Sequence, residues 1–111
     1  MKKKIYLFCS AGMSTSLLSN RMQKVGDENN LPVEVKAFPY DSLDEIFEKD
    51  RPDCILIGPQ MRFVVDKVKQ KYGSQGVPVA AIDPIDYGRI NAEKVLRFAV
   101  SLIKQAAKKE E

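Results

Sequence analysis

The chain has 111 residues, 44% of them hydrophobic and 30% charged, which is typical of one globular domain spanning residues 1–111. Its 18 basic and 15 acidic residues leave a net charge of +3, too small to indicate a nucleic-acid partner. Histidine is absent, which excludes Ser-His-Asp and Cys-His catalysis within this chain, and we expect no metal site. The first apolar run ends at Cys9, too early for a secretion signal or a membrane span, so we expect a cytoplasmic protein without membrane insertion.

The first half of the chain alternates strand and helix patterns. Ile5–Phe8 is an apolar run that predicts a strand. A helix is predicted from about Ser14 to Asn29, because apolar residues recur there at helical spacing, at Leu17, Leu18, Met22 and Val25. Val33–Ala37 alternates strictly between apolar and polar residues, which favours a strand at the edge of a sheet. Ser42 and Glu45 have the capping-box spacing and predict a short second helix.

The second half continues the alternation. Asp53–Ile57 reads as a fully buried strand, and Val79–Ile82 as a fourth strand. Between them, a third helix is predicted from the apolar stripe Met61, Val64, Val65 and Val68. The last helix carries the clearest stripe, with Asn91 as its expected cap; the stripe is Val95, Leu96, Ala99, Leu102, Ile103 and Ala106.

This order predicts an α/β fold, a doubly wound four-stranded parallel sheet with helices on both faces and right-handed crossovers. The one-sided polarity of Val33–Ala37 favours the spatial order 2-1-3-4. In that order the chain leaves the first strand at the topological switch point, where doubly wound sheets bind their ligands. The segment that begins at Cys9 is therefore the candidate site.

The residues after Cys9 are suited to an anion. They follow a strand and precede a helix N-terminus, where free backbone N–H groups and the helix dipole favour a phosphate and stabilise a thiolate. Gly12 is expected to help the backbone curl, and hydroxyl groups can bind phosphate oxygens. The predicted phosphate cradle is Ser10, Ala11, Gly12, Met13, Ser14, Thr15 and Ser16. We expect a solvent-accessible Cys9 sulfur that carries or faces the phosphate.

One other interpretation of Cys9 stays open, and the second cysteine, Cys54, has a different expected role. Cys9 could be a small buried hydrophobic residue in a binding or regulatory module, with the hydroxyl residues acting as helix caps. Cys54 lies within an apolar strand and is read as core. A disulfide between Cys9 and Cys54 is not expected, because one ends its strand and the other begins the neighbouring strand, an offset of about four residues at about 3.3 Å each.

Two chemistries use a cysteine in such a loop. A C-x5-R phosphatase has arginine six residues after the cysteine to clamp the phosphate, but this chain has Thr15 there. Asp83-Pro84, after the fourth predicted strand, is similar to the general-acid loop of the low-molecular-weight tyrosine phosphatases, but a strand-ending turn is the favoured interpretation. A phosphate carrier instead needs neutral donors that protect a phosphocysteine from water, and this loop fits that need.

The stretch IYLFCSAGMSTSLL closely resembles the start of the IIB components of the bacterial phosphoenolpyruvate-dependent sugar phosphotransferase system, in the lactose, cellobiose and diacetylchitobiose branch. The resemblance continues through AFP at Ala37–Pro39, ILIGPQ at Ile55–Gln60, YG at Tyr87-Gly88 and the alanine-rich last helix. It implies a fold similar to that of the low-molecular-weight tyrosine phosphatases. It also implies a protein-phosphocysteine–sugar phosphotransferase.

By this resemblance, Cys9 is the phosphocysteine nucleophile. It would accept a phosphoryl group from a phosphohistidine of the IIA protein and pass it to a β-linked disaccharide imported by the membrane-embedded IIC permease. No cofactor is implied, because the phosphoryl group is carried covalently. We expect a monomer whose docking rim for both partners includes Pro59, Gln60, Asp83 and Tyr87. Met13 would be either a contact for these partners or packing over the loop. A cysteine-dependent phosphatase of related fold is the alternative.

Overall fold

A computed structural model describes residues 2–10 and 12–109, without the side chains of residues 12–14 and 109. Within these residues, four parallel strands form one sheet in the order β2-β1-β3-β4. The strands are β1 (Lys3–Cys9), β2 (Val33–Pro39), β3 (Cys54–Ile57) and β4 (Val79–Ala81). The predicted fold class and strand order are confirmed, with β2 at an edge.

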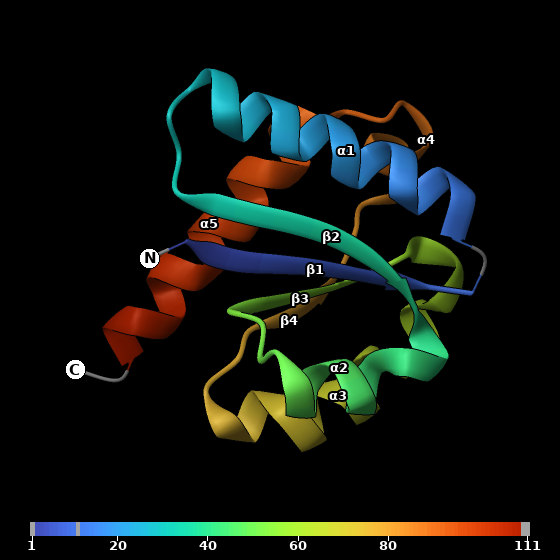
Figure 1. Cartoon of the computed structure of the whole chain (residues 1–111). Helices are drawn as coiled ribbons and strands as arrows, with labels where there is room; N and C mark the ends of the chain where they lie inside the picture. Colours follow the sequence, from blue (N-terminus) through green and yellow to red (C-terminus); the bar gives the residue numbers. More distant parts are fainter. Residues whose placement is uncertain (1, 11, 110–111) are drawn as a thin grey trace.

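Helices cover both faces of the sheet (Figure 1). The α-helices are α1 (Gly12–Glu28), α2 (Leu43–Lys49), α3 (Val65–Tyr72), α4 (Pro84–Gly88) and α5 (Ala92–Lys109). Three 3-10 helices join them, namely η1 (Tyr40–Ser42), η2 (Pro59–Val64) and η3 (Gly73–Gln75). In Figure 1, α1 and α5 lie on one side of the strands and α2 and α3 on the other.

The alternation of side chains along β1 divides the core into two clusters. Ile5 and Leu7 pack under α1 and α5 with Leu18, whereas Tyr6 and Phe8 pack on the opposite face. All four β1 side chains are fully buried, and burying one large apolar side chain stabilises the fold by about 1.5–3 kcal/mol. Side chains alternate between the two faces of a strand, so Cys9 points to the same face as Ile5 and Leu7, which is the face that α1 covers.

Two helix starts and one helix cap differ from the sequence prediction, while the predicted short second helix is confirmed as α2. The first helix begins at Gly12 rather than near Ser14, so Gly12 belongs to the helix and not to a preceding loop. The capping box at Ser42 is wrong, because Ser42 already has helical dihedral angles at the end of η1 and its side chain makes no capping hydrogen bond. The third helix begins only at Val65, because a kink at Met61 separates it from η2.

Two features near the C-terminal half were also settled by the structure. Asp83-Pro84 was interpreted as a turn, but it opens the short helix α4, which Asp83 caps. The cap predicted at Asn91 is confirmed, since its side-chain oxygen accepts a 3.3 Å hydrogen bond from the Lys94 amide.

Leu17, expected on the core stripe of the first helix, is 42% exposed.

Candidate functional site

Cys9 is the last residue of β1, a central strand, and α1 begins three residues later. The neighbouring strand β3 leaves the sheet beside it: the Gly58 amide donates to the Phe8 carbonyl at 2.9 Å. A β-carbon added at Gly58 would lie 3.0 Å from the Cys9 β-carbon, which is a very tight contact. A residue without a side chain at position 58 therefore leaves room for Cys9 at the carboxyl edge of the sheet.

The Thr15 hydroxyl donates a hydrogen bond to the Cys9 sulfur, with an O···S distance of 2.7 Å. Thr15 is fully buried and Cys9 is only 2% exposed. The expectation of a solvent-accessible sulfur was therefore wrong. The first turns of α1 pack over β1, so the residue six positions after the cysteine returns onto the sulfur. The sulfur therefore lies just below the surface.

Tyr87 completes this site from α4. Its hydroxyl lies 3.0 Å from the Thr15 hydroxyl oxygen, within hydrogen-bonding distance. The sequence placed Tyr87 only on a possible docking rim, whereas the structure places it one hydrogen bond away from the Thr15–Cys9 pair. No signal in the sequence linked residues 15 and 87, because only packing of α4 beside α1 brings them together.

The other residues of the predicted cradle divide into two groups. Ser10 and Ser16 are exposed, and Ser16 begins the second turn of α1, where its carbonyl accepts from the Ser19 hydroxyl at 2.9 Å. Ala11 lies outside the described residues, as do the side chains of Gly12, Met13 and Ser14. Of the predicted hydroxyl donors whose side chains are described, Thr15 is the one with a bond to the sulfur.

The predicted rim residues surround the same edge of the sheet. Pro59 and Gln60 begin η2 directly after β3, and Gln60 is exposed. A β-carbon added at Gly58 would lie 3.2 Å from the side-chain oxygen of Gln60 and 3.0 Å from the Cys9 β-carbon, so Gln60 and Cys9 flank the same glycine. Asp83 follows β4 and accepts hydrogen bonds from the amides of Ile85 and Asp86 at 2.8 and 3.2 Å.

Cys54 contrasts with Cys9. It is completely buried, and burial raises the pKa of its thiol to about 12. Neither Cys9 nor Cys54 is in a disulfide. Cys54 pairs with Ile5, four residues before Cys9 along β1, so the predicted offset that excludes a disulfide is confirmed.

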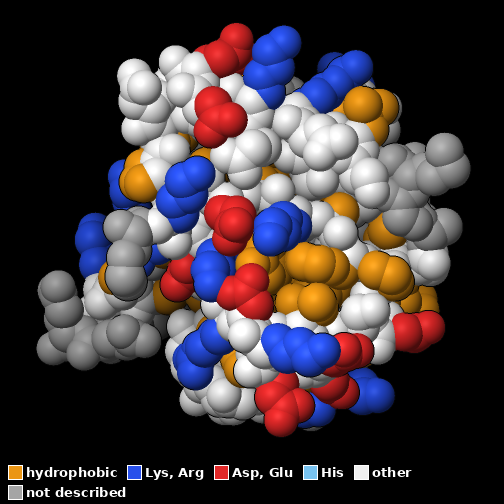
Figure 2. Space-filling view, viewed as in Figure 1, with side chains coloured by type: hydrophobic (Ala, Val, Ile, Leu, Met, Phe, Trp, Pro, Cys, Tyr) orange, Lys and Arg blue, Asp and Glu red, His pale blue; other side chains and the backbone are white. Residues whose placement is uncertain are grey.

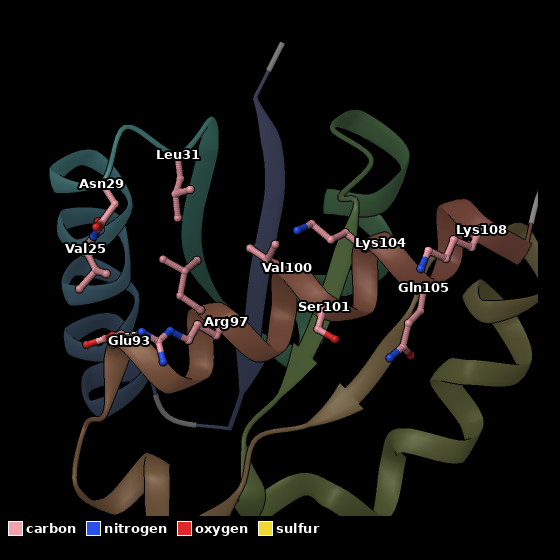
Figure 3. Close-up of a pocket in the computed structure, with 11 residues that line it drawn as sticks. Val25, Asn29, Leu31, Glu93, Arg97, Val100, Ser101, Lys104, Gln105 and Lys108 are labelled. Atoms are coloured by element: carbon pink, nitrogen blue, oxygen red, sulfur yellow. Dashed lines mark hydrogen bonds and ion pairs between the residues drawn. The ribbon is translucent and has the colours of Figure 1, made fainter.

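A groove of about 610 Å³ lies elsewhere, between the C-terminal half of α1, the start of β2 and the exposed side of α5 (Figure 3). Its lining includes the apolar Val25, Leu31 and Val100 and the basic Lys104 and Lys108. Leu31 precedes β2, so the groove opens toward the amino ends of the strands, whereas Cys9 lies at their carboxyl ends. The groove is not part of the cysteine site.

The geometry disfavours a phosphatase. Where a C-x5-R enzyme places a guanidinium, this chain places the Thr15 hydroxyl, which cannot neutralise a phosphate charge. The candidate general acid Asp83 is used as the cap of α4, where two backbone amides donate to one of its oxygens. A neutral donor on a thiol at a helix start suits a carrier that keeps its phosphoryl group.

Comparison with known proteins agrees with this geometry. The family model described as "PTS system, Lactose/Cellobiose specific IIB subunit" matches residues 4–98. The chain belongs to this family. The galactose-specific EIIB component of Lactococcus lactis subsp. cremoris (strain MG1363) is 39% identical over 104 residues, covering 91% of this chain and 96% of that protein. IIB components are phosphotransferases of the sugar phosphotransferase system, and so is this chain.

Two further relatives place this IIB chain in its structural context. The cellobiose-specific phosphotransferase IIB component of Borrelia burgdorferi has the same fold, with a TM-score of 0.77, 33% identity, and coverage of 96% of this chain and 95% of that one. The lactose-specific EIICB component of Staphylococcus haemolyticus (strain JCSC1435) is 24% identical over 105 residues, which are 95% of this chain but 17% of that protein. No helix among the described residues of the IIB chain is long and apolar enough to cross a membrane.

Proposed function

We propose that this IIB chain carries a phosphoryl group on Cys9, received from a phosphohistidine of a IIA protein and delivered to a sugar bound by a IIC permease. The observation that supports this most is the position of the Cys9 sulfur at the switch point of the sheet, with the Thr15 hydroxyl donating to it. Since the chain has no histidine, a phosphohistidine donor must belong to another protein.

The chemistry balances in two steps. First, the Cys9 thiolate attacks the phosphorus of the phosphohistidine; the S–P bond forms, the P–N bond breaks, and the leaving imidazole takes up the proton that the Cys9 thiol has lost. Next, a sugar hydroxyl attacks the phosphorus; an O–P bond forms, the S–P bond breaks and the electron pair returns to the sulfur. The hydroxyl proton goes to a base of the IIC–sugar complex. In-line geometry in both steps needs the two proteins to be pressed face to face at Cys9. No cofactor takes part.

The cradle assignment remains part of the proposal. Backbone amides at the start of α1 would hold the phosphoryl oxygens, because a helix N-terminus has unsatisfied N–H groups and a positive dipole end. Residues Ser10 to Ser16 contain the start of this helix. The Thr15 hydroxyl is already beside the sulfur, so a small rotation would let it donate to a phosphoryl oxygen instead.

Both partners would dock on the carboxyl edge of the sheet, since each must reach the Cys9 sulfur. Two large apolar side chains are exposed on the segments that flank it: Phe63 of η2 is 76% exposed and Ile85 of α4 is 65% exposed. With Pro59, Gln60, Asp83 and Tyr87, they make up what we call the docking rim. In Figure 2, hydrophobic atoms gather between the end of β2 and α2, while charges of both signs mix elsewhere on that face.

The family and the relatives suggest the transported sugar. Relatives are named for galactose, cellobiose and lactose, so we propose a β-linked disaccharide such as cellobiose or lactose. We propose that the chain works at the cytoplasmic face of the membrane as a monomer. The fused EIICB relative supports the IIC partner, because there a segment similar to this chain belongs to a protein whose name includes IIC.

Phosphoenolpyruvate, the general phosphotransferase proteins and a matching IIA protein test the proposal directly. We expect mass spectrometry to show one added phosphoryl group on the wild type and on Cys54→Ala, but none on Cys9→Ala. An undiminished adduct on Cys9→Ala, or no adduct on the wild type, would contradict it.

The docking rim has its own test. Phe63→Ser should raise the KM for the IIA protein about tenfold, since burying a phenylalanine side chain is worth about 1.5–3 kcal/mol. Leu31→Ser removes another large apolar side chain with exposed surface, 38% exposed, at the opposite ends of the strands, and should leave the KM unchanged. Equal effects of the two substitutions would refute the rim.

A further inference from the structure

Three hydroxyl and thiol groups form a chain that joins three elements. The Tyr87 hydroxyl of α4 lies 3.0 Å from the Thr15 hydroxyl of α1, which lies 2.7 Å from the Cys9 sulfur of β1. Thr15 and Tyr87 are 72 residues apart in sequence. Thr15 is fully buried and Tyr87 partly buried, so protein packing holds the middle of the chain away from solvent.

The charge on sulfur determines the direction of these hydrogen bonds. A thiolate can only accept, so the Thr15 hydroxyl must donate its one proton to it. The Thr15 oxygen can then only accept from Tyr87, whose hydroxyl proton remains available. In the thiolate state the order is therefore Tyr87 to Thr15 to Cys9, and each donor polarises the next.

Without Tyr87, the Thr15 hydroxyl has a competing partner. A threonine in a helix readily rotates its hydroxyl to a backbone carbonyl three or four residues earlier. A hydrogen bond from Tyr87 stabilises the Thr15 rotamer in which the hydroxyl oxygen faces α4 and the hydroxyl proton faces the Cys9 sulfur.

We propose that Tyr87 is a positioning residue for phosphoryl transfer, which holds the Thr15 hydroxyl as a donor to the Cys9 sulfur. This rests on the proposed role of Cys9. Negative charge resides on the sulfur before it accepts the phosphoryl group and again when the S–P bond breaks. A donor already in place at both moments stabilises that charge without reorganisation. Tyr87 acts through Thr15, since its own hydrogen bond is to the Thr15 oxygen.

The fold explains how Tyr87 reaches this position. Asp83 caps α4, and Pro84 occupies its first turn, so the five-residue helix begins immediately after β4 at the carboxyl edge. The backbone of Asp86 accepts from the Asn91 amide at 2.9 Å, which ties the end of α4 to the start of α5. These contacts anchor the segment that carries Tyr87 on both sides.

The charged groups near the site either have partners of their own or are exposed. On α4, Asp83 accepts from two backbone amides and the buried Asp86 pairs with Lys94 at 3.6 Å. On the other elements beside Cys9, Arg62 of η2 and Arg21 of α1 are exposed. A change in Cys9 reactivity on removing the Tyr87 hydroxyl therefore reports on the hydrogen-bonded chain, because none of these charges is altered.

The test measures the alkylation rate of Cys9 against pH in a Cys54→Ala background, without any phosphoryl donor. Thr15→Val removes the donor to the sulfur and should slow the alkylation of Cys9 about tenfold at neutral pH, because a hydrogen bond to a charged group is worth about 1.5–3 kcal/mol. Tyr87→Phe, which keeps the ring, should slow the alkylation about threefold. Thr15→Ser keeps the hydroxyl and should restore the wild-type profile. Tyr72→Phe removes a hydroxyl that bonds Asp44 away from the site and should change nothing.

The decisive variant combines Thr15→Val with Tyr87→Phe. If Tyr87 acts through Thr15, the double variant has the same profile as Thr15→Val alone. Additive effects, or a Tyr87→Phe profile equal to the wild type, would overturn the proposal. Phosphorylation of Cys9 by IIA is measured separately. An adduct on the wild type together with unchanged profiles would refute the role of Tyr87 while leaving the proposed function standing.

Discussion

The two cysteines should differ sharply in reactivity toward an alkylating reagent, and the difference can be estimated from the structure. Cys54 lies in the middle of the sheet, fully buried, where burial raises the pKa of its thiol from 9.0 to about 12. At pH 8 the thiolate fraction therefore falls from about one in ten to about one in ten thousand. Since the thiolate is the reactive form, the native Cys54 should react about a thousand times more slowly than an ordinary thiol.

The lack of access for the reagent lowers the alkylation rate of Cys54 further. Its side chain has no exposed surface, and global unfolding of small domains costs about 5–15 kcal/mol. Cys9 lies instead at the end of its strand, 2% exposed, beside the start of α1 and the Thr15 hydroxyl. We therefore expect Cys9 to react at least a hundred times faster than Cys54 in the folded protein.

The assay uses two single-thiol variants, Cys9→Ala and Cys54→Ala, alkylated at pH 8 and followed by intact-mass spectrometry. The same variants in urea give the unprotected rate of each thiol. We expect equal rates in urea and a large difference without it. If Cys54 reacts within tenfold of its rate in urea, or Cys9 is as inert as Cys54, the assignment of one cysteine to chemistry and the other to packing is refuted.

Two further predictions concern stability. Gly26→Ala places a β-carbon 2.6 Å from a γ-carbon of Val33 and should destabilise the fold by about 1 kcal/mol, the cost of overpacking less the gain in helix propensity. Its control, Gly73→Ala, has no contact closer than 3.7 Å and a φ of −60°, so it should stabilise by about 0.4–1 kcal/mol; thermal melts that rank these two variants the other way would contradict the packing argument. The hydrogen bond from Lys4 keeps the pKa of Asp50 below its ordinary value, so its contribution to stability is present above about pH 4 and is lost as pH falls through the lowered pKa. Asp50→Asn should accordingly be less stable than the wild type at pH 7 in urea titrations, and the difference should shrink as the pH falls below about 4; a difference that does not change with pH would refute this linkage.

The sequence by itself determined the framework of this protein. Apolar runs alternating with helical stripes predict a parallel α/β sheet, and the one-sided polarity of Val33–Ala37 placed that strand at the edge. The position of Cys9 between a strand end and a helix start was also readable, because both boundaries are local. Local patterns carry this information since periodicity reports which side of each element meets the core.

Local pattern was less reliable where neighbouring structure competes. Ser42 has a capping-box sequence, yet η1 leads directly into α2. The Leu43 amide therefore donates to the Tyr40 carbonyl of η1, and the Ser42 side chain makes no capping hydrogen bond. Asp83-Pro84 has the composition of a turn, yet the chain continues into α4 before α5 begins. In both cases the preceding or following segment decided the outcome.

Only the tertiary structure decided the surroundings of the sulfur. The burial of Cys9, the return of Thr15 onto it and the approach of Tyr87 depend on how α1 and α4 pack beside β1. Hydrogen bonds between side chains 72 residues apart leave no periodic trace in a sequence, because periodicity describes the faces of one element and not which atoms of two elements meet.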